Sequence, residues 1–170
     1  MSVGVSVHEV RTADDRALIR NLYPLYLHDL SAFTEFYEID ERGVFFPDYL
    51  PDWLDRESPM THPMVIRAGG RPAGFALVGQ APFPHMTRGR DFRMCEFFVL
   101  ARHRRRGVGR RAAHALFAMF PGVWEVSELP LNARAVAFWR SVIGEFTGGA
   151  YAEAIEHGDV VQVFDARRGR

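Results

Sequence analysis

A strand that runs through a basic, glycine-containing loop straight into a helix sets narrow limits on how this chain folds. Residues 94–100 form an apolar run that only Glu96 interrupts, and apolar residues recur at helical spacing over 107–119. The six residues 104–109, Arg-Arg-Arg-Gly-Val-Gly, join the two segments. A buried strand that turns at once into a helix is typical of a domain in which helices pack against a sheet.

The chemistry of this loop favours an anionic ligand. The first N–H groups of a helix have no partner within the helix, and the helix dipole is positive there. Glycine lets the main chain approach a bound group closely, and arginine adds positive charge around it. The loop therefore predicts a site for a phosphate or a diphosphate.

The composition is that of an ordinary globular protein. The chain has 170 residues, a formal net charge of zero and 48% apolar residues, so we expect one domain over residues 1–170. A neutral chain has no global field that would attract nucleic acid. The seven histidines show no metal-ligand spacing, so we expect no bound metal.

The cellular setting is read from the cysteine count and from hydropathy. Cys95 is the one cysteine and has no internal partner for a disulfide, which suits a reducing compartment. The sequence shows neither a signal peptide nor an apolar stretch of about 20 residues. We therefore expect a cytoplasmic protein that makes no membrane contact.

The periodicity of apolar residues predicts an α/β fold of the layered α+β type. The expected order is β-αα-β-β-β-α-β-α-β-β, with a mixed, mostly antiparallel sheet, flanking helices and one parallel crossover. Pro24 is expected to kink the first helix or to start a second one. The expected strands are 3–10, 63–68, 73–80, 91–100, 122–129, 145–151 and 159–164; the expected helices are 12–30, a turn near 48–55, 107–119 and one from Asn132. The tail 167–170 is expected to fray.

Two local patterns occur in this order and resemble those of the GCN5-related N-acetyltransferase (GNAT) superfamily. The loop fits Arg/Gln-x-x-Gly-x-Gly/Ala through Arg104, Gly107 and Gly109. The last helix fits Asn-x-x-Ala-x-x-Phe-aromatic through Asn132, Ala135, Phe138 and Trp139. The resemblance covers residues 63–146, and the amino-terminal third matches in element order alone.

The resemblance implies acetyl-coenzyme A as co-substrate. Its pyrophosphate would lie on the backbone amides of 105–110, its pantetheine arm along the main chain of 98–100, and its thiol end beside Asn132 and Phe138. The implied cofactor-binding residues are Phe98, Val99, Leu100, Arg104, Arg105, Arg106, Gly107, Val108, Gly109, Arg110, Asn132 and Phe138.

The implied reaction is acetyl transfer to an amine by direct attack in a ternary complex. The acceptor is a small molecule, an antibiotic-like amine or a protein N-terminus, and the residues do not separate these. A non-catalytic acyl-coenzyme A sensor is the first alternative, and a nucleic-acid-binding domain that uses the arginine cluster is the second. The resemblance also allows a homodimer.

Glu96 is the candidate catalytic base. Strand alternation would place it on the same face as Phe98 and Leu100, with Cys95 on the opposite face. Burial would raise the pKa of its carboxyl toward the range that suits a general base. The resemblance also places a base on this strand, whereas an ion pair with Arg93 is the structural alternative.

Trp139 departs from the family pattern, in which many members carry tyrosine as the acid that protonates the thiolate. An indole N–H donates a hydrogen bond but is no useful acid. Ser127, Tyr151 or a water is left for this role, or the thiolate leaves unassisted.

The segment 35–41 is the candidate acceptor site because it combines acidic and aromatic side chains. Glu35, Tyr37 and Glu38 would suit a cationic amine. The alternative is a solvated acidic loop.

Overall fold

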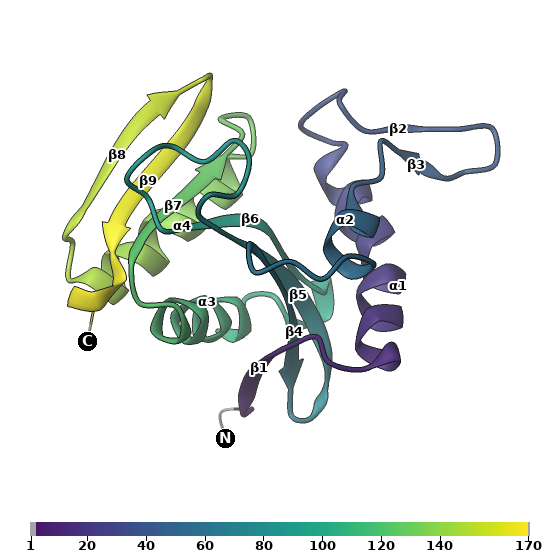
Figure 1. Cartoon of the computed structure of the whole chain (residues 1–170), viewed down its shortest axis with the longest axis horizontal. Helices are drawn as coiled ribbons and strands as arrows, with labels where there is room; N and C mark the ends of the chain where they lie inside the picture. The colour runs from purple at the N-terminus through teal and green to yellow at the C-terminus, as the bar shows by residue number, and fades with distance from the viewer. Residues whose placement is uncertain (1–2, 170) are drawn as a thin grey trace.

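Seven strands form one mixed sheet in the order β1-β4-β5-β6-β7-β9-β8 in the computed structural model, which describes residues 3–169 (Figure 1). β6 and β7 are parallel, and every other neighbouring pair in this sheet is antiparallel. The strands are β1 Val5–Glu9, β4 Thr61–Ala68, β5 Arg71–Gln80, β6 Phe92–Val99, β7 Val123–Glu128, β8 Tyr151–Glu156 and β9 Asp159–Asp165. The predicted layered fold with a mostly antiparallel sheet and one parallel crossover is confirmed.

Two pairs of helices cover the two faces of the sheet (Figure 1). α1 (Ala13–Leu30) and α2 (Leu50–Leu54) pack with Phe75 and Phe98 on one face. α3 (Val108–Met119) and α4 (Ala133–Thr147) pack with Trp124 and Phe164 on the other. None of the helices within residues 3–169 has the length and apolar character of a membrane span.

The first helix is continuous, so the predicted division at Pro24 is wrong. Thr12 and Asp15 form a capping box at its start, and the helix continues past Pro24 to Leu30. Tyr23 and Leu27 are buried on either side of the proline. Packing of this face against the sheet stabilises the helix across the missing N–H donor.

The segment 31–60 is mostly irregular, and the helical turn expected near 48–55 is α2. It also contains the two-residue strands β2 (Glu38–Ile39) and β3 (Phe45–Phe46), which pair with each other only. This hairpin projects away from the sheet beside α1 and α2 (Figure 1).

The prediction of a strand over 145–151 is wrong except at Tyr151, where β8 starts. α4 continues to Thr147 because Ile143 and Phe146 extend its buried face. Gly148 and Gly149 then adopt left-handed φ angles of 63° and 85°, which end the helix, and β8 starts at Tyr151.

The tail is also more ordered than predicted. Ala166–Arg168 form a short 3₁₀ helix, η2, because the Asp165 carboxylate accepts from the Arg167 backbone N–H. That carboxylate also pairs with the Arg167 side chain. Arg170, at the end of the predicted frayed segment, lies outside the described residues.

β6 and β7 pair over a short distance and then separate. The pairs run from Phe92–Trp124 to Met94–Val126, whereas β6 continues to Val99 and β7 to Glu128. On its other edge, β6 pairs with β5 as far as Val99. The carboxyl-terminal half of β6 therefore has a partner strand on one side only.

Gly74 fixes the distance between β5 and this half of β6. A Cβ atom added at Gly74 would lie 1.9 Å from the Phe98 backbone oxygen. We expect Gly74→Ala to reduce the free energy of unfolding by about 1–3 kcal/mol, because the strands must move apart. Gly4→Ala is the control, since no heavy atom lies within 4 Å of its added Cβ, and its effect should stay within about 0.5 kcal/mol. Equal stability of the two variants in urea denaturation would contradict this packing argument.

Candidate active site

The loop between β6 and α3 presents a row of unpaired backbone N–H groups. After the short 3₁₀ helix η1 (Ala101–His103), Arg105 and Gly107 adopt left-handed φ angles of 58° and 73°. Within residues 3–169, no partner accepts from the N–H groups of 105–110, and Arg111 is the first to donate into α3, to the Gly107 carbonyl. Alternating left-handed residues with free N–H groups form a concave anion site.

Gly109 brings the start of α3 close to α4. A Cβ atom there would lie 3.2 Å from the Phe138 ring and 3.6 Å from the Val99 side chain. Phe138 therefore packs directly over the first turn of α3. Glycine at this position keeps the loop, the end of β6 and α4 in contact.

The loop arginines divide into two groups. Arg104 Nε donates to the Val99 carbonyl at 2.7 Å, and its guanidinium pairs with Asp29 of α1. Arg110 pairs with Glu145 of α4 at 2.8 Å. The side chains of Arg105 and Arg106 are exposed and make no ion pair within residues 3–169. These two are available to a bound anion.

A cavity of about 460 Å³ lies where β6 and β7 separate. Side chains from β6, β7, α1, α4 and the segment 34–37 line it. Its lining residues are Tyr26, Leu30, Thr34, Phe36, Tyr37, Arg93, Met94, Cys95, Phe97, Val126, Ser127, Glu128, Leu129, Asn132, Ala135, Trp139 and Asp159.

The main chain of β6 also faces this cavity. Leu100 N–H donates to the Ala73 carbonyl of β5, so this N–H is already occupied. Residues of an antiparallel pair direct their backbone groups alternately toward and away from the partner strand. Phe97 and Val99 therefore present their backbone groups on the side that β7 has left, while those of Phe98 face β5.

Glu96 is bonded to a tyrosine rather than to Arg93. Its carboxylate accepts from the Tyr26 hydroxyl of α1, whereas Arg93 donates to the His85 carbonyl and pairs with Glu125. Burial raises the pKa of Glu96 to about 7, although the hydrogen bond from Tyr26 opposes this rise. Burial and the nearby Glu96 charge raise the pKa of Tyr26 well above its usual range. Tyr26 lines the cavity, and Glu96 lies behind it.

The expected position of Cys95 opposite Glu96 is wrong because β6 contains a bulge. Pairing with β5 shifts from Leu77–Glu96 to Val78–Met94 and leaves Cys95 unpaired. Cys95 packs with Leu77 and Phe98 on the same face as Tyr26. Burial raises the pKa of its thiol to about 12, so the thiol is a poor nucleophile.

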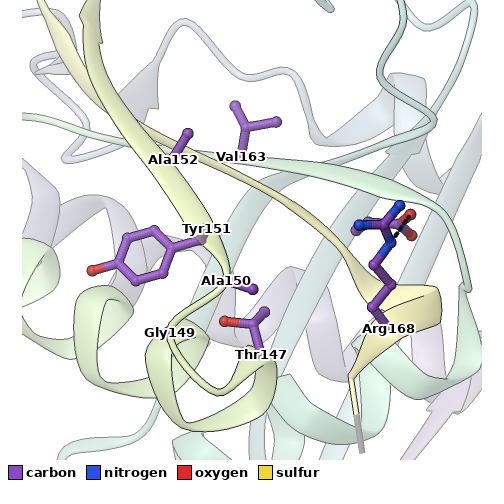
Figure 2. A pocket seen from close by; sticks show the side chains of 8 residues that line it. Thr147, Gly149, Ala150, Tyr151, Ala152, Val163 and Arg168 are labelled. Carbon is purple, nitrogen blue, oxygen red and sulfur yellow. Dashed lines mark ion pairs between the residues drawn. The ribbon is translucent and has the colours of Figure 1, made fainter.

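A second cavity, of about 420 Å³, lies between the end of α4 and the β8–β9 hairpin (Figure 2). Thr147, Tyr151 and Val163 are among its lining residues, and the Arg168–Asp165 ion pair lies at one side. Of the predicted site residues in the described part of the chain, none in the donor or acceptor sets lines it. Tyr151, a candidate acid, thus faces this second cavity, whereas Ser127 lines the one between β6 and β7.

A sequence model of the acetyltransferase (GNAT) family matches residues 22–144. The chain belongs to this family. The predicted class, a GNAT-type N-acetyltransferase enzyme, is thereby confirmed. A search of curated proteins by sequence found no match.

Solved structures share the GNAT fold at low sequence identity. An acetyltransferase from Thermus thermophilus is 16% identical, with a TM-score of 0.69 and coverage of 96% of this chain and 98% of its own. The ribosomal-protein-S18-alanine N-acetyltransferase of Escherichia coli is 13% identical, with a TM-score of 0.56 and coverage of 96% and 94%. The protein yncA of Salmonella typhimurium, solved with its cofactor acetyl-CoA, is 15% identical, with a TM-score of 0.59 and coverage of 95% and 94%.

The second GNAT pattern lies at the start of α4. Asn132 is the N-cap, and its Oδ1 accepts from Ala135 N–H at 3.2 Å, while its side chain also lines the cavity. Trp139 is 6% exposed and packs edge-on against Phe97, with 5.0 Å between ring centroids. Trp139 thus forms part of the apolar wall of the GNAT cavity, at the position where a tyrosine hydroxyl would stand.

The predicted acceptor residues separate in the structure. Tyr37 lines the cavity, together with Thr34 and Phe36. Glu35 and Glu38 are exposed and do not line it.

Sequence reasoning missed Tyr26, Glu128 and Asp159 as cavity residues. Tyr26 follows helical spacing on α1 and is typical of a core residue, although its hydroxyl reaches Glu96. Glu128, at the end of β7, and Asp159, at the start of β9, come together with Ser127 only when the two strands pair. The polar run Ser-Glu at 127–128, after the apolar part of a strand, was the available signal.

The raised pKa of Glu96 gives a testable dependence of stability on pH. Between its usual pKa of 4.5 and the folded value of about 7, the folded state binds more protons than the unfolded chain. This carboxyl therefore lowers wild-type stability as pH rises through that window. Glu96→Gln removes the effect, so its free energy of unfolding relative to wild type should increase over this range and be constant on either side. Urea denaturation across the window measures it, and a difference that does not change with pH would contradict the assignment.

Proposed function

We propose that this GNAT protein transfers the acetyl group of acetyl-CoA to a primary amine. The observation that carries the proposal is that β6 leads from the cavity between β6 and β7, which its residue Phe97 lines, to the row of free N–H groups at 105–110. A helix start with free N–H groups favours a phosphate group, and the adjoining cavity has room for the reacting ends of two substrates. The similar protein yncA, whose structure contains acetyl-CoA, supports the choice of donor.

The residues present fit a diphosphate with an extended polar arm. The N–H groups of 105–110 and the side chains of Arg105 and Arg106 would hold the phosphates. The backbone groups of Phe97 and the N–H of Val99 would bind the amide-containing arm as a strand binds its neighbour, while the Val99 carbonyl accepts from Arg104 Nε. Asn132 and Phe138 would flank its thiol end.

When bound, acetyl-CoA would supply an activated acyl group as a thioester. Val99 N–H would donate to the carbonyl oxygen and stabilise the charge that develops there. Holding both substrates in one cavity would orient the amine for direct attack on the thioester carbon, where the C–N bond would form, the C–S bond would break and coenzyme A would leave as its thiolate. Cys95 lines the cavity, but the raised pKa of its thiol, about 12, keeps it protonated and supports this direct route over transfer through the enzyme.

The proton of the attacking amine would leave through Tyr26 and Glu96. The Tyr26 hydroxyl lies between the cavity and the Glu96 carboxylate. The amine proton would pass to Tyr26 Oη as the phenolic proton moves to Glu96. A carboxylate whose pKa is about 7 is suited to accept a proton near neutral pH.

A non-catalytic acyl-CoA sensor is the second candidate, and Trp139 is the observation that favours it. Release of coenzyme A over a panel of amines separates the two functions, since a sensor binds acetyl-CoA without turnover. The arginine cluster gives less support to nucleic-acid binding, because Arg104 and Arg110 are held in ion pairs.

Binding of acetyl-CoA tests the donor site. At about 100 times its dissociation constant, acetyl-CoA should raise the free energy of unfolding by about 2.7 kcal/mol. The double variant Arg105→Ala/Arg106→Ala should weaken binding by about tenfold or more, because charge-assisted hydrogen bonds to phosphate are lost. Arg42→Ala, at the tip of the β2–β3 hairpin, is the matched control. No stabilisation of the wild-type protein at millimolar acetyl-CoA would refute the proposal.

Kinetics test the proton route. The kcat/KM of the wild-type enzyme should rise with pH through about 7 as Glu96 loses its proton. Glu96→Gln should lower turnover by about 100-fold or more and remove this rise of kcat/KM with pH. Tyr26→Phe should also lower turnover, because it removes the hydroxyl that carries the proton to Glu96. Its residual kcat/KM should rise at a higher pH than that of the wild-type enzyme, because the hydrogen bond from Tyr26 lowers the pKa of Glu96. If the pH dependence of kcat/KM is unchanged in both variants, Tyr26 and Glu96 do not form the proton route.

A further inference from the structure

A second buried carboxyl group, which the proton route above does not use, lies on the opposite wall of the cavity. Glu128 ends β7, lines the cavity and is 5% exposed. Its Oε2 accepts from Gln162 Nε2 of β9 at 3.0 Å. Its Oε1 is buried and has no hydrogen-bond partner within residues 3–169. A buried carboxyl oxygen without a donor is unfavourable unless a ligand completes its contacts.

The carboxyl groups around Glu128 are in excess over the guanidinium groups. Burial raises the pKa of Glu128 most, and the hydrogen bond from Gln162 opposes this rise. Glu153 of β8 and Asp159 of β9 raise the pKa further, and Arg140 of α4 lowers it. Arg140 is already paired with both oxygens of Glu153, at 2.6 and 2.8 Å. Three carboxyl groups therefore face one guanidinium.

The other cation at the cavity does not compensate for this excess. Arg93 is held by Glu125 and by the His85 carbonyl. Asp159 also lines the cavity, where it accepts from the Ser127 hydroxyl at 2.9 Å. On the cavity wall formed by β7 and β9, Glu128 and Asp159 line the cavity, and neither strand contributes a cationic side chain to the lining.

We propose that Glu128 and Asp159 form a subsite for a second cationic group of the acceptor, so that the acceptor is a diamine or polyamine. This inference rests on the proposed function, which supplies the reacting amine at the opposite wall. An ammonium group donates up to three hydrogen bonds, and Glu128 Oε1 and Asp159 offer acceptors for them. A neutral or acidic acceptor would leave both carboxyl groups without a partner.

The rest of the cavity suits the alkyl chain between two ammonium groups. Phe97, Trp139 and Tyr37 line it, so methylene groups would contact aromatic faces. Aromatic rings also attract ammonium groups and alkylammonium carbons. A cavity of about 460 Å³ accommodates a short diamine beside the reacting end of a co-substrate.

Binding of a cation at this subsite should change the protonation of Glu128. Burial raises the pKa of Glu128 to about 8, so this carboxyl is largely protonated near neutral pH. A bound ammonium favours the ionised form and lowers this pKa. Binding of a diamine near neutral pH therefore releases a proton from Glu128, and diamine affinity rises with pH up to about 8.

Calorimetry with putrescine and butane-1,4-diol tests the subsite without any acetyl transfer. The two probes have the same chain, and hydroxyl groups replace both ammonium groups in the second. Putrescine should bind wild-type protein at least about tenfold more tightly than the diol, with proton release detected in two buffers of different ionisation enthalpy. Glu128→Gln should abolish both the difference in affinity and the proton release. Glu57→Gln, which changes an exposed carboxyl outside the cavity, should retain both.

Equal affinity for the two probes, no binding of putrescine, or a difference that persists in Glu128→Gln would overturn the inference. If Glu128→Gln does not fold, Asp159→Asn serves instead, and an unchanged preference for putrescine in that variant would overturn it. Acetyl-transfer assays with amine probes test the proposed function, independently of the calorimetry. Failure to acetylate any amine would refute the proposed function, whereas the calorimetry would still decide whether the subsite exists.

Discussion

The parallel contact between β6 and β7 ends after Met94 and Val126, and the candidate site depends on this early separation. β5 keeps β6 extended as far as Val99, so the backbone of Phe97 and Val99 remains strand-like without a partner on the cavity side. Gly74 allows β5 to lie against the Phe98 carbonyl where no side chain would fit. The same extended segment leads into the loop of free N–H groups, so an anion site and a strand-like groove are continuous.

Two buried carboxyl groups serve different parts of the cavity because their partners differ. Glu96 lies behind a phenol, which separates it from the cavity and opposes the effect of burial on its pKa. Glu128 lines the cavity itself, and its amide partner leaves one oxygen free. Burial raises both pKa values, but in the proposed function Glu96 receives a proton through Tyr26, whereas Glu128 contacts a cation directly.

Local patterns in the sequence predicted the fold and led to the proposed donor site, because the loop at 104–109 and the cap at Asn132 each lie within a few consecutive residues. The contacts that decide the acceptor side are not local. Glu96 meets Tyr26 across 70 residues, and Glu128 meets Gln162 across 34. The bulge at Cys95 was invisible because its cause is the register against β5, and the end of α4 was misplaced because Phe146 is apolar in a strand or a helix alike. Such features depend on which elements pack together, and periodicity does not report that.

Arg104 joins the loop to α1 by its ion pair with Asp29, and it binds the Val99 carbonyl with the same side chain. Asp29 and Tyr26 are three residues apart on α1, so they lie on neighbouring positions of one helical turn. The Arg104 side chain thus connects the loop at 104–109 both to the end of β6 and to α1, one helical turn from the phenol that contacts Glu96.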